Sequence, residues 1–96
     1  MNPIEITPVF VEGEMIDDSL FEERKIYISR EYGLAIHRCL CGCGNKVVMP
    51  INHEGWDWGW NFIEAEGKVS FHPSVGNWNW PCQSHYVITN NVAIPV

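Results

Sequence analysis

The sequence is poor in basic residues. Of its 96 residues, 6 are Lys or Arg and 12 are Asp or Glu, which gives a formal net charge of −6. The few basic residues are scattered along the chain rather than gathered in one segment. Because nucleic-acid affinity depends largely on clustered Lys and Arg that displace counterions, we expect no nucleic-acid partner.

The sequence also lacks a long hydrophobic run. Although 46% of its residues are hydrophobic, nothing approaches the roughly eighteen consecutive apolar residues of a membrane span. The N-terminal residues Met1–Ile6 show neither the positive charge nor the apolar stretch of a secretion signal. We therefore expect a single soluble domain over residues 1–96 that is located in the cytoplasm and does not contact a membrane.

A sustained helical period is missing as well. Short alternating segments, rich in β-branched and aromatic residues, are separated by turn signals such as Glu66-Gly67 and Asn90-Asn91. We expect Pro8 to confine the first strand to a sheet edge, and residues 72–77 to form a turn. The expected strands are Ile4–Glu12, Lys25–Arg30, Leu34–Leu40, Lys46–Ile51, Trp60–Ala65, Lys68–His72, His85–Thr89 and Val92–Val96. The sequence thus predicts a mostly β domain, an antiparallel sandwich or rolled sheet with little or no helix.

Cysteine is scarce, and all four cysteines lie in two short clusters. Three alternate in a glycine-containing loop, and the fourth precedes a histidine by three residues. Such clusters are typical of a zinc site that joins two distant segments, with each sulfur about 2.3 Å from the metal. The candidate ligands are Cys39, Cys41, Cys43, Cys82 and His85. Five candidates compete for four positions, and the spacing does not decide which of the three clustered cysteines bind; His37 is a weaker sixth candidate.

The alternatives to a metal site are a pair of disulfides and free core thiols. An even number of cysteines in so short a chain permits disulfides, but the expected cytoplasmic location disfavours them. Alternate positions on an extended strand are also poorly placed to bridge each other. A four-ligand zinc site rich in cysteine is closed and structural, whereas three protein ligands and a water make a catalytic one. We therefore expect one structural zinc.

Fragments of two enzyme motifs occur, and neither is complete. Pro81-Cys82-Gln-Ser-His85 is similar to the second half of a zinc-deaminase signature, but the H-x-E half is missing because His53 is followed directly by Glu54. His53-Glu54 also begins like H-E-x-x-H, but Asp57 stands in place of the second histidine. We assign no catalytic residue and expect a binding module. A small zinc-dependent hydrolase or deaminase-like enzyme is the alternative.

Five tryptophans lie in two short segments with a spacing of two residues. They are Trp56, Trp58, Trp60, Trp78 and Trp80. If the segments are extended, each set shares one face. Core packing is one interpretation. The other is an exposed contact surface for a protein partner, because exposed apolar patches mark interfaces and Trp is frequent among their hot spots.

Three motifs follow one another in a distinctive order within residues 34–94. They are the Cys39–Gly44 loop, Pro73-Ser74 at the end of a strand, and Cys82-Gln-Ser-His85 before a final hairpin. This succession resembles a family of small bacterial and phage proteins of unknown function, whose signature is C-P-C-G-C-G, P-S and C-x-S-H. The resemblance implies a zinc-binding β domain associated with ubiquitin-like conjugation or with phage and host conflict, and implies no chemistry. Leu40 stands where the family usually has proline, and the excess of tryptophan is a second departure.

Overall fold

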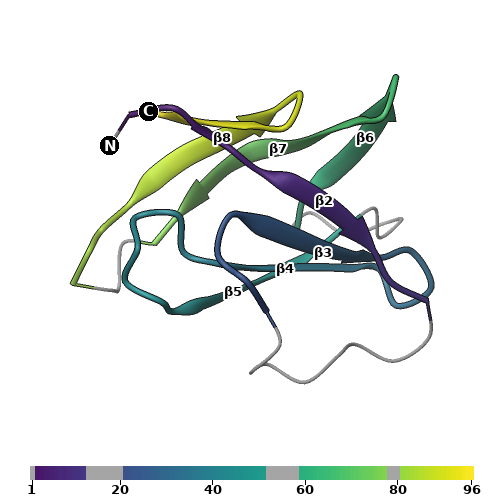
Figure 1. Ribbon diagram of the computed structural model, residues 1–96, viewed down its shortest axis with the longest axis horizontal. Coiled ribbons are helices and arrows are strands. Elements are labelled where there is room, and N and C mark those ends of the chain that lie inside the picture. Colours follow the sequence, from purple (N-terminus) through teal and green to yellow (C-terminus); the bar gives the residue numbers. More distant parts are fainter. Residues whose placement is uncertain (1, 13–20, 52–58, 78–80) are drawn as a thin grey trace.

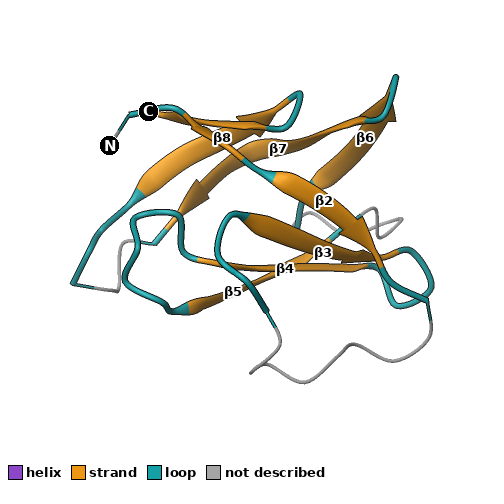
Figure 2. Cartoon of the chain, viewed as in Figure 1, coloured by secondary structure: helices purple, strands orange, loops and turns teal. Residues whose placement is uncertain are grey.

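The computed structural model describes residues 2–12, 21–51, 59–77 and 81–96, and these residues form two β-sheets without a helix (Figures 1 and 2). One sheet has five strands in the order β1-β9-β8-β7-β6, and the other has four in the order β2-β3-β4-β5. The strands are β1 (Ile4–Glu5), β2 (Thr7–Phe10), β3 (Lys25–Ser29), β4 (Leu34–Arg38), β5 (Lys46–Pro50), β6 (Asn61–Ala65), β7 (Lys68–Gly76), β8 (His85–Thr89) and β9 (Val92–Pro95). Within this described part of the chain, no helix could cross a membrane.

The N-terminal segment belongs to both sheets. The expected single strand is divided at the buried Ile6, so that β1 pairs antiparallel with β9 and β2 pairs parallel with β3. Pro8 lies in β2, at the edge of the four-stranded sheet, where its missing N–H leaves no ladder bond unmade. At the other side of the molecule, an isolated bridge joins Ile51 to Trp60 between the two sheets. The predicted mostly antiparallel β fold is confirmed.

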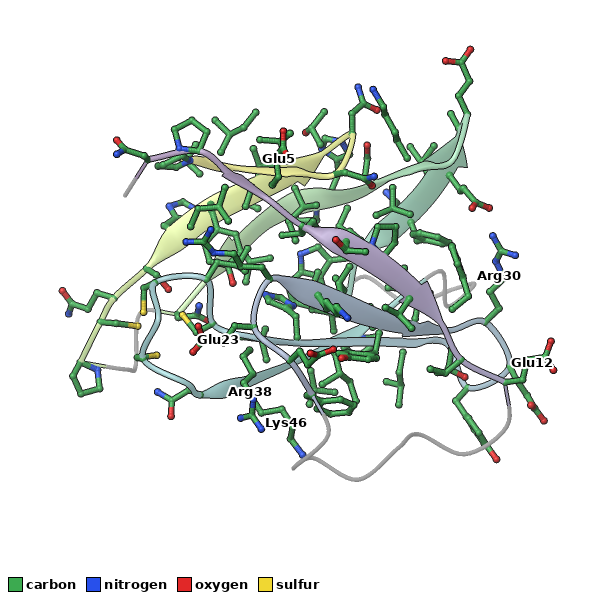
Figure 3. The ribbon with its side chains drawn as sticks, viewed as in Figure 1. Glu5, Glu12, Glu23, Arg30, Arg38 and Lys46 are labelled. Atoms are coloured by element: carbon green, nitrogen blue, oxygen red, sulfur yellow. The ribbon has the colours of Figure 1, made fainter. Side chains whose placement is uncertain are left out.

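Alternation along the strands places one side of each sheet in a shared core. Figure 3 shows these side chains filling the space between the sheets. Ile26 and Ile28 of the four-stranded sheet face Phe71 and Ile88 of the five-stranded sheet, and all four are fully buried. Burying one such side chain contributes about 1.5–3 kcal/mol. A smaller cluster of Phe21, Tyr27 and Ile36 lies apart from this core.

Two tight hairpins form where the sequence predicted turns. Glu66 and Gly67 have φ of 54° and 77°, and Asn90 and Asn91 have φ of 48° and 65°. Two successive positive φ values match the right-handed twist of the flanking strands, and Gly and Asn tolerate them best. These hairpins set the pairings β6/β7 and β8/β9.

The expected turn over residues 72–77 is wrong, because β7 continues to Gly76. Phe71 pairs with Ile88 and Val75 pairs with Tyr86, so three residues of β7 lie opposite one residue of β8. Such a bulge lets Pro73, which has no N–H, sit inside a strand without breaking its continuation. The bulge carries Ser74, whose hydroxyl contacts the imidazole of His85 in β8.

Candidate functional site

The loop between β4 and β5 holds three of the four cysteines at one end of the molecule. The Cys39 N–H donates to the carbonyl oxygen of Asn45 at 2.7 Å, and the Gly42 N–H donates to that of Cys39 at 3.1 Å. Gly42 and Gly44 have φ of 93° and 82°, in the left-handed region that glycine adopts without a Cβ penalty. These two glycines let the chain reverse tightly enough for alternate residues to point inward together.

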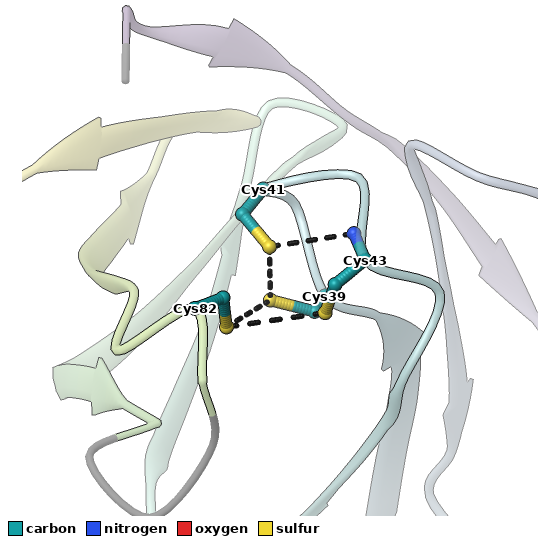
Figure 4. Close-up of side chains that lie close together, drawn as sticks. All are labelled: Cys39, Cys41, Cys43 and Cys82. Atoms are coloured by element: carbon teal, nitrogen blue, oxygen red, sulfur yellow. Dashed lines mark hydrogen bonds between the residues drawn. The ribbon is translucent and has the colours of Figure 1, made fainter.

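All four cysteine sulfurs converge on one point, although Cys82 is far from the others in sequence. The Sγ atoms of Cys39, Cys41, Cys43 and Cys82 all lie within 4.8 Å of one another (Figure 4). The sulfur of Cys39 is 3.3 Å from that of Cys41 and 3.9 Å from that of Cys82. The sulfur of Cys43 is also 3.9 Å from that of Cys82. The four cysteines are free thiols, not disulfides.

This arrangement suits a tetrahedral metal ion. Four sulfurs at about 2.3 Å from a central zinc would be separated by about 3.8 Å. The three separations given above, 3.3, 3.9 and 3.9 Å, lie around that value. The four cysteines could therefore hold one metal ion, and a set of four thiolates is the donor chemistry of zinc or iron sites.

The thiols have unequal surroundings. Cys39 is 2% exposed, Cys82 is half-buried, and the other two are exposed. Hydrogen bonding to the side chain and backbone of Ser84 lowers the pKa of Cys82 to about 6, whereas burial raises the pKa of Cys39. This lowering favours the thiolate form of Cys82, and the thiolate is the form that binds metal ions.

His85 lies beside a serine, outside the group of four cysteines. Its Nε2 atom is 2.6 Å from the Oγ atom of Ser74, and both side chains are half-buried. His85 pairs with Gly76 across β7 and β8, and Ser74 precedes that glycine by two residues. Residues two apart on a strand share a face and reach diagonally to the neighbouring strand, so the register itself brings this pair together.

A serine hydroxyl in contact with an imidazole nitrogen is the basic arrangement of a nucleophile and its general base. Sequence reasoning named Ser74 only as part of a motif and gave it no role, because residues 72–77 were expected to form a turn. The available signal was its position in the Pro73-Ser74 motif. His85 lines a pocket of about 660 Å³ together with Ser84 and Cys82.

The other candidate residues have different outcomes. His37 is fully buried in β4, with Nε2 2.7 Å from the hydroxyl of Tyr86. Trp60 is partly buried and packs against the main core. Trp56, Trp58, Trp78 and Trp80 lie outside the described residues, so the tryptophan surface stays a prediction.

Comparison with known families gives one match. The family model described as "Bacterial ubiquitination-like system serine protease (BubE)" matches residues 12–95. This range includes all three motifs of residues 34–94, and the predicted link to a bacterial ubiquitin-like system is confirmed. No curated protein and no solved structure matches the chain significantly.

Proposed function

The chain belongs to the family of the bacterial ubiquitination-like system serine protease, BubE, and on that premise we propose that it is a small serine protease with Ser74 as nucleophile. The observation that carries the proposal is the 2.6 Å contact between Ser74 Oγ and His85 Nε2. The family description names the activity, and this contact supplies a nucleophile and a base for it.

The reaction needs both side chains. A serine hydroxyl is a weak nucleophile at neutral pH, so His85 Nε2 takes its proton as Ser74 Oγ attacks the carbonyl carbon of the substrate. The imidazolium then gives that proton to the leaving amine, and an acyl ester remains on Ser74. Water attacks the ester with His85 again as base, and the carboxylic acid product leaves. General base assistance of this kind contributes roughly 10²–10⁴-fold to the rate.

The cysteine cluster has a structural part in this proposal. Cys39, Cys41, Cys43 and Cys82 would hold one zinc ion as four thiolates, and a site closed in this way would have no position for a reactive water. These four residues would thereby join the β4–β5 loop to the segment that leads into β8. The alternative, a zinc-dependent hydrolase or deaminase-like enzyme, is less well supported because its metal would need an open position.

The partner in this proposal is a polypeptide substrate of a ubiquitination-like system. It approaches through the pocket beside His85, and Trp56, Trp58, Trp78 and Trp80 contribute to its contact surface. The negative net charge and scattered basic residues support a protein partner over a nucleic acid. In this proposal, the protein partner expected from the sequence is the substrate of the enzyme. The expected accessory role is the part that the enzyme plays in the ubiquitination-like system.

Labelling with a fluorophosphonate probe tests the proposal. The probe forms a covalent bond from phosphorus to an activated serine oxygen and releases fluoride. We expect mass spectrometry to locate one adduct per chain, on Ser74, and expect the adduct to be absent in Ser74→Ala and at least about 10²-fold slower to form in His85→Ala. Ser70→Ala, on the same strand, is the matched control and should be labelled normally. Labelling that persists unchanged in Ser74→Ala would refute the assignment.

A further inference from the structure

Asn77 and Ser84 form the next contact of the β7/β8 pair beyond Gly76 and His85. The Asn77 backbone N–H donates to the carbonyl oxygen of Ser84 at 2.9 Å. The Asn77 side chain also donates from Nδ2 to the Oγ of Ser84, at 2.8 Å. Ser84, the residue directly before His85, therefore makes two hydrogen bonds with Asn77, which directly follows the end of β7.

The same two side chains contact the cysteine cluster. Ser84 Oγ lies 3.1 Å from the sulfur of Cys39 and 3.6 Å from that of Cys82. Because the Ser84 oxygen accepts a hydrogen bond from Asn77, its own hydrogen can be directed to the nearer sulfur, that of Cys39. Asn77 Nδ2 is itself 3.6 Å from the same sulfur. Asn77 and Cys39 are both buried, at 9% and 2% exposure, so water competes little for these contacts.

We propose that Asn77 and Ser84 are positioning residues that couple the cysteine cluster to His85. This inference rests on the proposed protease function, because it concerns the base of that reaction. A thiolate held on a metal ion is a charged acceptor, and hydrogen bonds to charged groups are roughly twice as strong as those between neutral groups. With the metal bound, Cys39 therefore fixes Ser84, and Ser84 fixes the residue that follows it.

The contacts between β7 and β8 explain how this coupling affects the activity. The position of His85 is set by its register with Gly76, which the Asn77–Ser84 contact extends by one step. A displacement of about 1 Å in a catalytic group can lower the rate by about 10²-fold. Replacement of a residue that hydrogen-bonds to a metal ligand typically changes the metal affinity or the activity by about 10–100-fold. The metal site thus controls activity without contacting the substrate.

The test compares two variants of this contact with two controls. Ser84→Ala removes the hydroxyl, and Asn77→Ala removes the donor amide while it keeps Ser84. Ser84→Thr restores a hydroxyl. Ser70→Ala is the matched control, because its hydroxyl accepts from the N–H of Asn90 in a different part of the same sheet, at 2.9 Å. For every protein the metal content, kcat, KM and the ¹H–¹⁵N signals of the His85 ring are measured, with His85→Ala used to assign those signals.

We expect both variants to retain one metal ion per chain, with kcat lower by roughly 10–100-fold and KM nearly unchanged. The His85 ring signals should shift in both, whereas the Ser84→Thr and Ser70→Ala proteins should resemble the wild type in kcat and in these signals. Unchanged kcat and unchanged ring signals in the two variants would overturn the coupling. Loss of folding or of the metal in both would overturn it equally, since the side chains would then hold the fold rather than His85. If the wild-type protein cleaves nothing, the protease function fails, and the ring signals still decide the coupling.

Discussion

Gly76 pairs with His85 across β7 and β8, and the His85 imidazole contacts Ser74, two residues before that glycine. Directly opposed residues on antiparallel strands have Cβ atoms about 4.5–5.5 Å apart, so any side chain at position 76 would stand beside the His85 ring. The space around the proposed base, His85, thus depends on the residue at position 76, which takes no part in the reaction.

Side chains of increasing size at position 76 should therefore lower activity in steps. Gly76 lacks the positive φ found at five other glycines, so Gly76→Ala and Gly76→Val require no strained backbone. We expect a small decrease in kcat/KM for alanine and a decrease of about tenfold or more for valine, whose branched side chain would stand beside the imidazole. Steady-state kinetics and thermal denaturation should show that activity falls while the fold is kept. Equal activity of the valine variant and the wild type would contradict this account.

Metal content should separate the roles of Cys82 and His85, which the sequence placed in one ligand set. Because four sulfurs already lie within 4.8 Å of one another, we expect His85→Ala to bind one equivalent of zinc and to be inactive. Cys82→Ser should lose at least about tenfold in zinc affinity, because one of four ligands is removed. Elemental analysis gives the zinc content, and competition with a chromophoric chelator gives the zinc affinity. A His85→Ala protein that loses its zinc would show instead that His85 is a ligand.

Removal of the metal should unfold the domain. Apparent zinc-binding free energies at structural sites are about 10–16 kcal/mol, as large as the entire stability of a typical domain at about 5–15 kcal/mol. We expect a strong chelator to abolish the cooperative thermal transition, and added zinc to restore it. The measurement is circular dichroism during a thermal scan. A chelated, metal-free protein with an undiminished Tm would exclude a structural role for the cluster.

Stability should fall in acid because of His37. Burial lowers the pKa of His37 to about 4 from 6.5, so between these values the unfolded chain binds a proton that the folded chain does not. His37 therefore does not lower the free energy of unfolding above pH 6.5. As the pH falls from 6.5 toward 4, it lowers that free energy by up to about 3 kcal/mol. His37→Gln, which can still bond the Tyr86 hydroxyl, should lack this part of the decrease.

Urea denaturation of both proteins at several pH values measures the difference. Comparing the two also cancels the protonation of the cysteine thiols, which occurs in each. Parallel stability curves for His37→Gln and the wild type would show that His37 contributes nothing to acid sensitivity.

The predicted tryptophan surface should affect substrate binding more than folding. Trp58→Ala and Trp78→Ala are expected to raise KM by about tenfold or more, since truncation of an interface hot spot typically costs about 2 kcal/mol or more. The fold should be kept, as judged by thermal denaturation. Trp60→Ala serves as the contrasting variant, because Trp60 packs against the core and its loss should lower Tm. Unfolding in every variant would favour the core interpretation.

Much of the β structure was predictable because it depends on local patterns. Alternation predicted strands over Lys25–Arg30 and Lys46–Ile51, and the observed β3 (Lys25–Ser29) and β5 (Lys46–Pro50) each differ from them by one residue. The turns at Glu66-Gly67 and Asn90-Asn91 were predictable because the required backbone conformation favours these residue types. The extension of β7 was not predictable, because Pro73 normally ends a strand and only pairing with β8 accommodates it in a bulge.

The sequence by itself determined the donor chemistry: four thiols in two clusters, with glycines that permit a tight loop, and an acidic chain of short alternating strands. Only the tertiary structure decided that all four sulfurs meet and that the His85 imidazole contacts Ser74 instead of joining them. The physical reason is register. Pairing between β7 and β8 fixes the face on which each strand residue projects and the residue that lies opposite to it. The spacing of cysteines and histidines along the chain does not determine that pairing.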